Sequence, residues 1–339
     1  KAYQALEKQG QKWHIHGYIT VIGCYLLMMF YTTVSGWMLH YFYLTATGKF
    51  TGLDADQVGG VFNEMLSQPL VMAFWMIVVV AIGIFVCSRG LQNGLEKITK
   101  VMMIALLAIM VVLAINSIMM DGAAEGLKFY LIPDFERMKE LGIGYTIVTA
   151  MNQAFFTLSL GIGAMAIFGS YIGKDRSLMG ESIHIIILDT LVAVIAGIII
   201  FPACFTYDVE VTAGPSLLFD TMATVFNHMA GGRFWGTLFF VFMTFAALTT
   251  VLAVFETILA CCMDLFGWSR KKACLINCLL LLVPCKYGTG SMLRRQPVVQ
   301  APLTWTTDPP SPLPLAVSSL HLAPHAQDAL PAPCAQDRS

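Results

Sequence analysis

The chain has 339 residues, of which 57% are hydrophobic and only 12% are charged, and its formal net charge is -1. A soluble domain carries about 25% charged residues, so this composition indicates a protein embedded in a membrane. The balanced charge argues against a nucleic-acid partner. The nine cysteines lack the paired spacing of a zinc site.

Six low-charge runs are each long enough to cross a bilayer, which takes about 20 apolar residues. They cover residues 13–43, 69–87, 101–120, 143–173, 183–207 and 234–263. A shorter apolar run, 273–283, ends at Pro284 and predicts a truncated seventh helix. Lys and Arg gather in alternate loops, so the positive-inside rule predicts a multi-pass cell-membrane protein whose first residues are cytoplasmic.

The three loops on the other side, 49–64, 121–140 and 208–233, mix apolar and turn residues. Two interpretations fit this pattern. Such loops are either ordered caps over a binding site or amphipathic segments that rest on the lipid headgroups.

The fourth run contains the segment QAFFTLSLGIG at 153–163, with two glycines and two hydroxyls at its midpoint. Glycine tolerates non-helical dihedrals, so the helix is predicted to unwind there. The freed carbonyls then require partners, which a bound ion or substrate supplies, as in secondary transporters with broken helices. The alternative is a glycine-kinked helix packed closely on its neighbours.

The composition changes at Pro284, because ten of the 14 prolines lie from this residue onward. We therefore divide the chain into a transmembrane part, 1–283, and a proline-rich tail, 284–339, that is expected to be disordered. Two origins fit this tail: a regulatory segment, or an out-of-frame or chimeric stretch, which we favour because the change falls in mid-span.

Polar residues within the spans are candidates for function, since they are costly in lipid. Asp189 is an acid near the start of the fifth run and is a candidate for function. The alternative interpretation is that it lies close enough to the cytoplasmic face to be hydrated. Thr249 and Thr250 lie in the middle of the sixth run and either bond back to the helix or form an oxygen-rich site for Na⁺. Glu256 shows no partner in the sequence, and structural pairing is as good an interpretation of it as function.

These residues bring a resemblance into view. The segments FYTTVSGW (30–37), QAFFTLSLG (153–161), 188–203 and FAALTT (245–250) resemble the neurotransmitter:sodium symporter family, in particular its bacterial amino-acid transporters. They look like the third, unwound sixth, seventh and eighth helices. The resemblance covers 1–283 and implies an all-α membrane protein with a partial inverted-repeat fold of the leucine-transporter type. It also implies a fragment that lacks the family's first two helices and everything after a truncated ninth.

The resemblance implies a role for each matching residue. Tyr31 would bind the substrate carboxylate, and Phe156 would cover the substrate from outside. The substrate-binding set as a whole is Leu27, Tyr31, Phe156, Thr157, Ser159, Ile162, Thr250 and Val254. The sodium ligands are Thr157 and Asp189 in one site, and Ala246, Thr249 and Thr250 in a second. Tyr171 and Asp264 match the cytoplasmic gate, whose arginine would lie before Lys1.

Chloride is a further expectation. Many relatives have Asn where this chain has Asp189, and eukaryotic relatives use chloride near this site, where Gln153 matches one of its ligands. An acid at position 189 would supply the negative charge internally, so we expect transport that does not require chloride.

The sequence therefore predicts a sodium-coupled symporter of a neutral, hydrophobic or aromatic amino acid, with Na⁺ as coupling ion and no other cofactor. The fragment itself is expected to be inactive. A transporter of another family with the same fold is the closest alternative. An ion channel would need a ring of repeated polar residues, and an enzyme would need a nucleophile with a base; neither pattern is seen.

Overall fold

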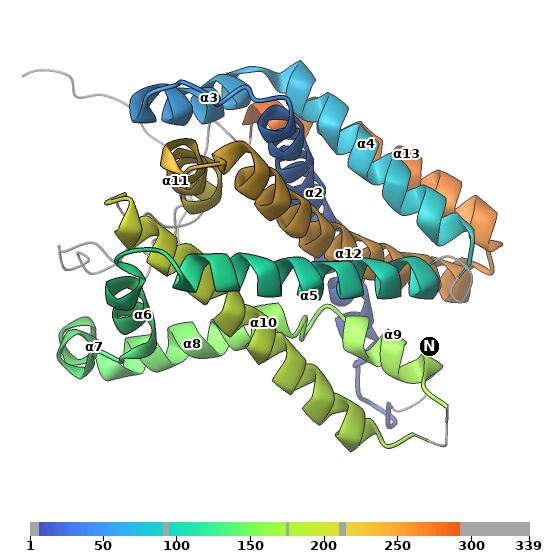
Figure 1. The fold of residues 1–339 in the computed structure, drawn as a ribbon. Helices are drawn as coiled ribbons and strands as arrows, with labels where there is room; N and C mark the ends of the chain where they lie inside the picture. Colours follow the sequence, from blue (N-terminus) through green and yellow to red (C-terminus); the bar gives the residue numbers. More distant parts are fainter. Residues whose placement is uncertain (1–6, 91–94, 174–175, 210–214, 292–339) are drawn as a thin grey trace, which may run out of the picture. The chain divides into compact units, whose positions relative to one another are not determined.

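The computed structural model describes residues 7–90, 95–173, 176–209 and 215–291. Within these ranges every regular element is a helix (Figure 1). The elements are α2 (His14–Ala46), α3 (Ala55–Ser67), α4 (Pro69–Ser88), α5 (Lys97–Ile118), α6 (Ala123–Leu131), α7 (Phe135–Leu141), α8 (Ile143–Thr157), α9 (Ala164–Tyr171), α10 (Leu178–Thr206), η2 (Leu217–Thr221), α11 (Met222–His228), α12 (Gly232–Phe266) and α13 (Arg270–Ser291).

Five of these helices are long and apolar enough to cross a bilayer, namely α2, α4, α5, α10 and α12. They coincide with five of the six predicted spans. The remaining span, 143–173, is divided into α8 and α9, with residues 158–163 non-helical between them. The all-α membrane fold is confirmed, and so is the interruption that the glycines predicted.

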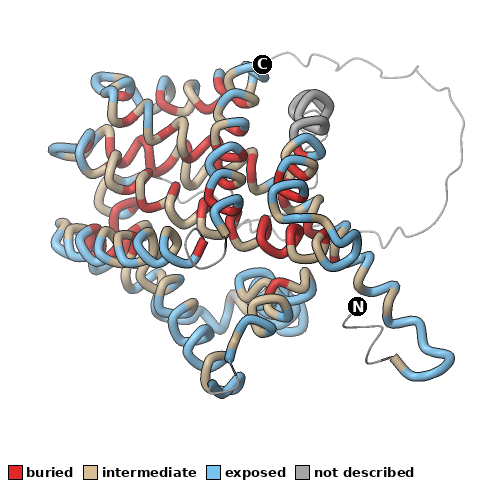
Figure 2. The backbone as a smooth tube through the Cα atoms, turned by 90° about the vertical axis from the view of Figure 1, so that its right-hand side faces the viewer, coloured by how far each residue is buried: buried red, intermediate tan, exposed pale blue. Residues whose placement is uncertain are grey.

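Helices α2 and α12 form the centre of the fold and run antiparallel. Thr45 lies against Gly236, Tyr41 packs on Phe240 with ring centroids 5.3 Å apart, and Tyr25 faces Cys262. Residue numbers rise along α2 as they fall along α12. Both helices are largely apolar all round and contribute many of the buried residues, which gather where the helices pack together (Figure 2).

The close contact between α2 and α4 depends on a glycine. A Cβ atom built on Gly36 of α2 would lie 2.9 Å from the backbone nitrogen of Met76 in α4. Membrane helices use small residues in this way, because the helices attract each other through close packing rather than through a hydrophobic effect. Helix α13 packs along α4 and also contacts α2 (Figure 1).

Two of the outer loops are folded onto the helical core. Phe62 of α3 stacks on Phe219 of η2 with ring centroids 5.3 Å apart, and Phe219 also contacts Tyr41 of α2 at 4.9 Å. The described parts of these two loops are therefore packed on the core, and a role as caps over a binding site stays a prediction. Loop 121–140 differs, because α6 packs on α10 while Phe135 of α7 keeps 60% of its surface exposed.

The predicted boundary between transmembrane part and tail falls inside α13, which continues past Pro284 to Ser291. Residues 292–339 lie outside the described residues, so the predicted disorder and origin of the tail stay predictions.

The α2–α4 contact can be tested with two glycines on the same helix. Gly36→Ala should lower the free energy of unfolding by about 1–3 kcal/mol, because its methyl group meets backbone that cannot move aside. Gly23→Ala is the matched control, since open space surrounds Gly23 and alanine favours the helix. Thermal unfolding in detergent measures both. Equal stability of the two variants would contradict the close contact.

Candidate functional site

The centre of the candidate site is the interruption between α8 and α9. Ser159, Gly161 and Gly163 have positive φ values of 53°, 92° and 75°. This left-handed conformation suits glycine and is uncommon for serine. Three such residues in alternation end the i→i+4 ladder, so the carbonyls of this segment need partners from elsewhere.

The residues predicted to line a substrate pocket lie around this interruption. The rings of Tyr31 in α2 and Phe156 in α8 are 6.4 Å apart at an interplanar angle of 34°. Leu27, one turn before Tyr31, packs with Ile162 against the inner apolar cluster that contains Val254 of α12. The structure therefore brings five predicted pocket residues from four segments into one region. Ser159 lies within the interruption itself.

The first predicted sodium pair is in contact. The Thr157 hydroxyl at the end of α8 donates to both carboxylate oxygens of Asp189 in α10, at 3.0 and 3.1 Å. The two residues are 32 positions apart in sequence, so only the fold joins them. A hydroxyl and a carboxylate are the oxygen donors that a hard cation prefers.

The second predicted sodium set lies on a single turn of α12. The hydroxyls of Thr249 and Thr250 donate to the Ala246 carbonyl at 2.9 and 3.3 Å. This is the ordinary back-bond of hydroxyl residues in helices, and it gathers three oxygens. Across the described part of the chain, no hydrogen bond links this set to Thr157 or Asp189.

The predicted gate residues are not joined to each other. Asp264 is exposed near the end of α12 and makes no hydrogen bond or ion pair within the ranges that the structure covers. The Tyr171 hydroxyl at the end of α9 instead donates to Oε1 of Glu256, at 3.2 Å.

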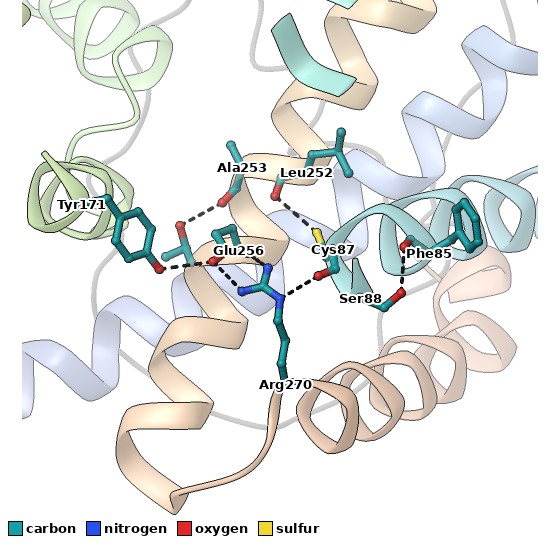
Figure 3. Close-up of polar contacts among 9 residues, drawn as sticks. Phe85, Cys87, Ser88, Tyr171, Leu252, Ala253, Glu256 and Arg270 are labelled. Carbon is teal, nitrogen blue, oxygen red and sulfur yellow. Dashed lines mark hydrogen bonds and ion pairs between the residues drawn. The ribbon is translucent and has the colours of Figure 1, made fainter. Parts of the chain in front are cut away.

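Glu256 has a partner that the sequence did not reveal (Figure 3). Its carboxylate is fully buried and accepts from both terminal nitrogens of Arg270, from Nη1 at 3.1 Å and also from Nη2. Arg270 Nε donates to the Cys87 carbonyl at 2.7 Å. The pair forms because the chain turns at Gly267, with φ 64°, and brings Arg270 back along α12. We refer to Tyr171, Glu256 and Arg270 as the buried ion-pair network.

The network explains why an acid is tolerated within a span. A buried carboxylate is costly unless it is paired and fully hydrogen-bonded, and a bidentate guanidinium meets both conditions. The sequence held one signal, since Arg270 is a basic residue in the loop that follows the span of Glu256. That loop was assigned to membrane orientation, and nothing in the pattern connected it with the acid.

The sequence itself matches a family model described as the sodium:neurotransmitter symporter family over residues 61–289. The chain belongs to this family. Its members are transporters rather than enzymes. This agrees with the interruption between α8 and α9 and with the polar groups of Thr157, Asp189, Thr249 and Thr250.

Individual sodium:neurotransmitter symporters agree. The chain is 33% identical over 294 residues to the uncharacterized sodium-dependent transporter YhdH of Bacillus subtilis, a match that covers 85% of this chain and 64% of that protein. It is 27% identical to a sodium-dependent transporter of Methanocaldococcus jannaschii over 85% of this chain and 62% of that protein. A crystal structure of MhsT in complex with L-phenylalanine is 34% identical, with a TM-score of 0.74, over 83% of this chain and 63% of that chain. The chain thus spans less than two thirds of the length of these relatives.

Removal of Arg270 should expose the energetic role of the network. Arg270→Met leaves a buried, unpaired carboxylate and should cost about 3–5 kcal/mol of stability. Adding Glu256→Gln should restore most of this loss, because the uncompensated charge is then removed. Thermal unfolding of both single variants and the double variant measures the coupling between the two side chains.

Arg176→Met is the control, because Arg176 pairs with Glu181 on the surface and keeps 66% of its side chain exposed. Its cost should be at most about 1 kcal/mol. Additive losses at Arg270 and Glu256 would contradict the pairing.

Proposed function

We propose that the protein containing this chain is a sodium-coupled symporter of neutral, hydrophobic or aromatic amino acids. The observation that carries the proposal is the helix interruption beside a group of uncharged, mostly apolar side chains, Leu27, Tyr31, Phe156, Ile162 and Val254, which we propose line the substrate pocket. None of these side chains is charged, so the pocket suits an apolar substrate side chain. Membership of the family supports sodium coupling, and the MhsT structure with L-phenylalanine supports an amino-acid substrate.

The interrupted helix suits a zwitterion together with a cation. Helix α8 ends at Thr157 and α9 begins at Ala164. The carbonyl end of a helix carries partial negative charge and the amide end partial positive charge. The end of α8 and its Thr157–Asp189 pair therefore favour Na⁺, while the start of α9 and the Tyr31 hydroxyl favour the substrate carboxylate.

The aromatic contact between Tyr31 and Phe156 supports a covering role for Phe156. Its ring keeps 54% of its surface exposed, so a substrate between it and the inner cluster would bury apolar area from both sides. Burial of this kind stabilises the complex by about 25 cal/mol for each Å² removed from water. We propose that Phe156 closes the pocket when substrate is bound.

Sodium acts here as a co-transported substrate. Threonine hydroxyls, the Ala246 carbonyl and the Asp189 carboxylate would replace its hydration shell. The membrane potential then contributes about 2.3 kcal/mol per charge per 100 mV. We place the segment before α2 in the cytoplasm, which puts Tyr171, Asp264 and the buried ion-pair network at the cytoplasmic end of the fold, where access to the site is controlled.

The relatives are longer than this chain, and we propose that the 339 residues alone do not transport. The resemblance implies that groups from the family's first helix would also reach each sodium site and the substrate carboxylate. Half-exposed Asp189 and exposed Thr157 are consistent with a site that further residues complete.

The central prediction concerns uptake into vesicles reconstituted with the full-length protein that contains this chain. Uptake of L-leucine or L-phenylalanine should require an inward sodium gradient and fall to background when choline replaces sodium. Excess L-leucine, L-phenylalanine or L-tryptophan should compete, whereas glutamate and lysine should not, because the pocket has no charged partner for their side chains.

Vesicles with the 339-residue chain alone are the matched negative arm and should show no sodium-driven uptake. Full accumulation by the long protein in choline would contradict the proposal. Competition by glutamate or lysine but not by leucine would contradict the assignment of the pocket.

Chloride should have no effect on this uptake, because Asp189 provides the negative charge beside Thr157. Replacing chloride with gluconate should leave the rate within about twofold. Asp189→Asn, which keeps the shape and removes the charge, should reduce uptake in gluconate by about tenfold, equivalent to roughly 1.4 kcal/mol. A wild-type protein that needs chloride would show that Asp189 does not have this role.

A further inference from the structure

Two side chains of α2 contact the interruption at positions that precede the predicted pocket residues Leu27 and Tyr31 along the helix. The Thr20 hydroxyl donates to the Gly161 carbonyl at 3.4 Å, and the Cys24 thiol donates to the Ile162 carbonyl at 3.1 Å. Thr20 keeps only 7% of its surface exposed and Cys24 only 1%. Two consecutive carbonyls of the non-helical segment are thus satisfied by two donors that lie one helical turn apart.

The contact is close as well as polar. A Cβ atom on Gly163 would lie 2.8 Å from the Thr20 methyl group, and the φ of +75° at Gly163 further favours glycine. Thr20, Cys24, Leu27 and Tyr31 follow the i, i+4, i+7, i+11 spacing of one helix face. This face therefore contacts the interruption through Thr20 and Cys24, and it contributes Leu27 and Tyr31 to the predicted pocket.

Position 162 links the interruption with the predicted pocket. Its carbonyl is held by Cys24, while its side chain packs against the inner cluster with Leu27 and Tyr31. A residue outside a regular helix has no i→i+4 bond to hold its peptide plane, and the flanking residues Gly161 and Gly163 add conformational freedom. The donors on α2 are thus what orients the peptide planes on either side of Ile162.

We propose that Thr20 and Cys24 are positioning residues of the substrate pocket, and that Cys24 sets its selectivity by fixing the direction of the Ile162 side chain. The inference rests on the proposed function, since it concerns which amino acid fits. It also has a consequence for ligands. The Gly161 and Ile162 carbonyls each already accept one hydrogen bond from α2, so a ligand that bound either oxygen would share it with that donor.

We assign no other role to the Cys24 thiol. Cys24 is distant in sequence from Ile162 by 138 positions and lies outside every residue set that the sequence assigned to sodium or substrate. A thiol is only a weak donor, but a buried carbonyl without any donor is costly. Removal of the Cys24 thiol should therefore change the orientation of the Ile162 peptide plane while the fold as a whole is retained.

The test compares binding of L-leucine and L-phenylalanine to the purified full-length protein in sodium. Cys24→Ala should change the ratio of the two dissociation constants by about fivefold or more, because a displaced Ile162 changes the space for the larger side chain. Cys24→Ser keeps a donor and should leave the ratio within about twofold of wild type. Half-saturation by sodium should change by less than about twofold in both variants, since the Thr157–Asp189 pair is untouched.

Cys204→Ala is the matched control. Cys204 is as buried as Cys24, at 0% exposure, but it lies in α10 within a different apolar cluster, the one that contains Tyr41 and Phe219. Its removal deletes the same atom and should leave the binding ratio unchanged. A purely structural role for Cys24 would weaken both amino acids and sodium together, without a change in ratio.

A second pair of variants keeps the inference testable if Cys24→Ala does not fold. Thr20→Val retains the shape of threonine and removes its hydroxyl, whereas Thr20→Ser retains the hydroxyl. Thr20→Val should change the leucine to phenylalanine ratio in the same direction, and Thr20→Ser should not. Unchanged ratios in the folded donor-less variants would overturn the inference and leave the proposed function intact. A wild-type protein that binds neither amino acid in sodium would overturn both.

Discussion

The structure depends on one constraint, which is that backbone carbonyls inside a membrane must have partners. Lipid offers no hydrogen bonds, so non-helical backbone persists at this depth only where protein or a polar ligand satisfies it. The segment 158–163 breaks the ladder between α8 and α9. Thr20 and Cys24 satisfy two of its carbonyls, and the ends of the two half-helices flank the region where we propose that Na⁺ and the substrate bind.

The antiparallel pair α2 and α12 is the support on which this interruption rests. Helix α2 presents donors and pocket residues along one face, and α12 contributes Val254, the Thr249–Thr250 oxygens and Glu256. Tight packing of the pair, with the outer caps α3, η2 and α11 folded onto it, fixes where these groups lie. Tyr171 of α9 therefore meets a partner, Glu256 of α12, whose position this packing fixes.

The buried ion-pair network shows how a charge is tolerated in this environment. Glu256 is fully buried, yet Arg270 and Tyr171 hydrogen-bond its carboxylate, and the Cys87 carbonyl orients the guanidinium. The network joins α9, α12, α13 and α4 at one point. A change in the position of α9 would therefore alter the contacts of the Glu256 carboxylate, which connects the interrupted helix with α4, α12 and α13.

Local sequence was enough to predict five of the spans and the interruption of the sixth, because hydropathy and glycine conformation act over a few residues. It also indicated the Thr249–Thr250 turn, since residues four apart in a helix are neighbours. The pairs Thr157–Asp189, Cys24–Ile162 and Glu256–Arg270 were decided by tertiary structure. The resemblance suggested the first of them, and no pattern in the chain indicated the other two. In each pair the two residues lie on different segments, and the sequence pattern of one segment does not indicate which residue of the other it meets. In the third pair, a turn at Gly267 also brings Arg270 back toward α12. A polar atom in a span signals that a partner is needed, but only the packing of helices determines which residue supplies it.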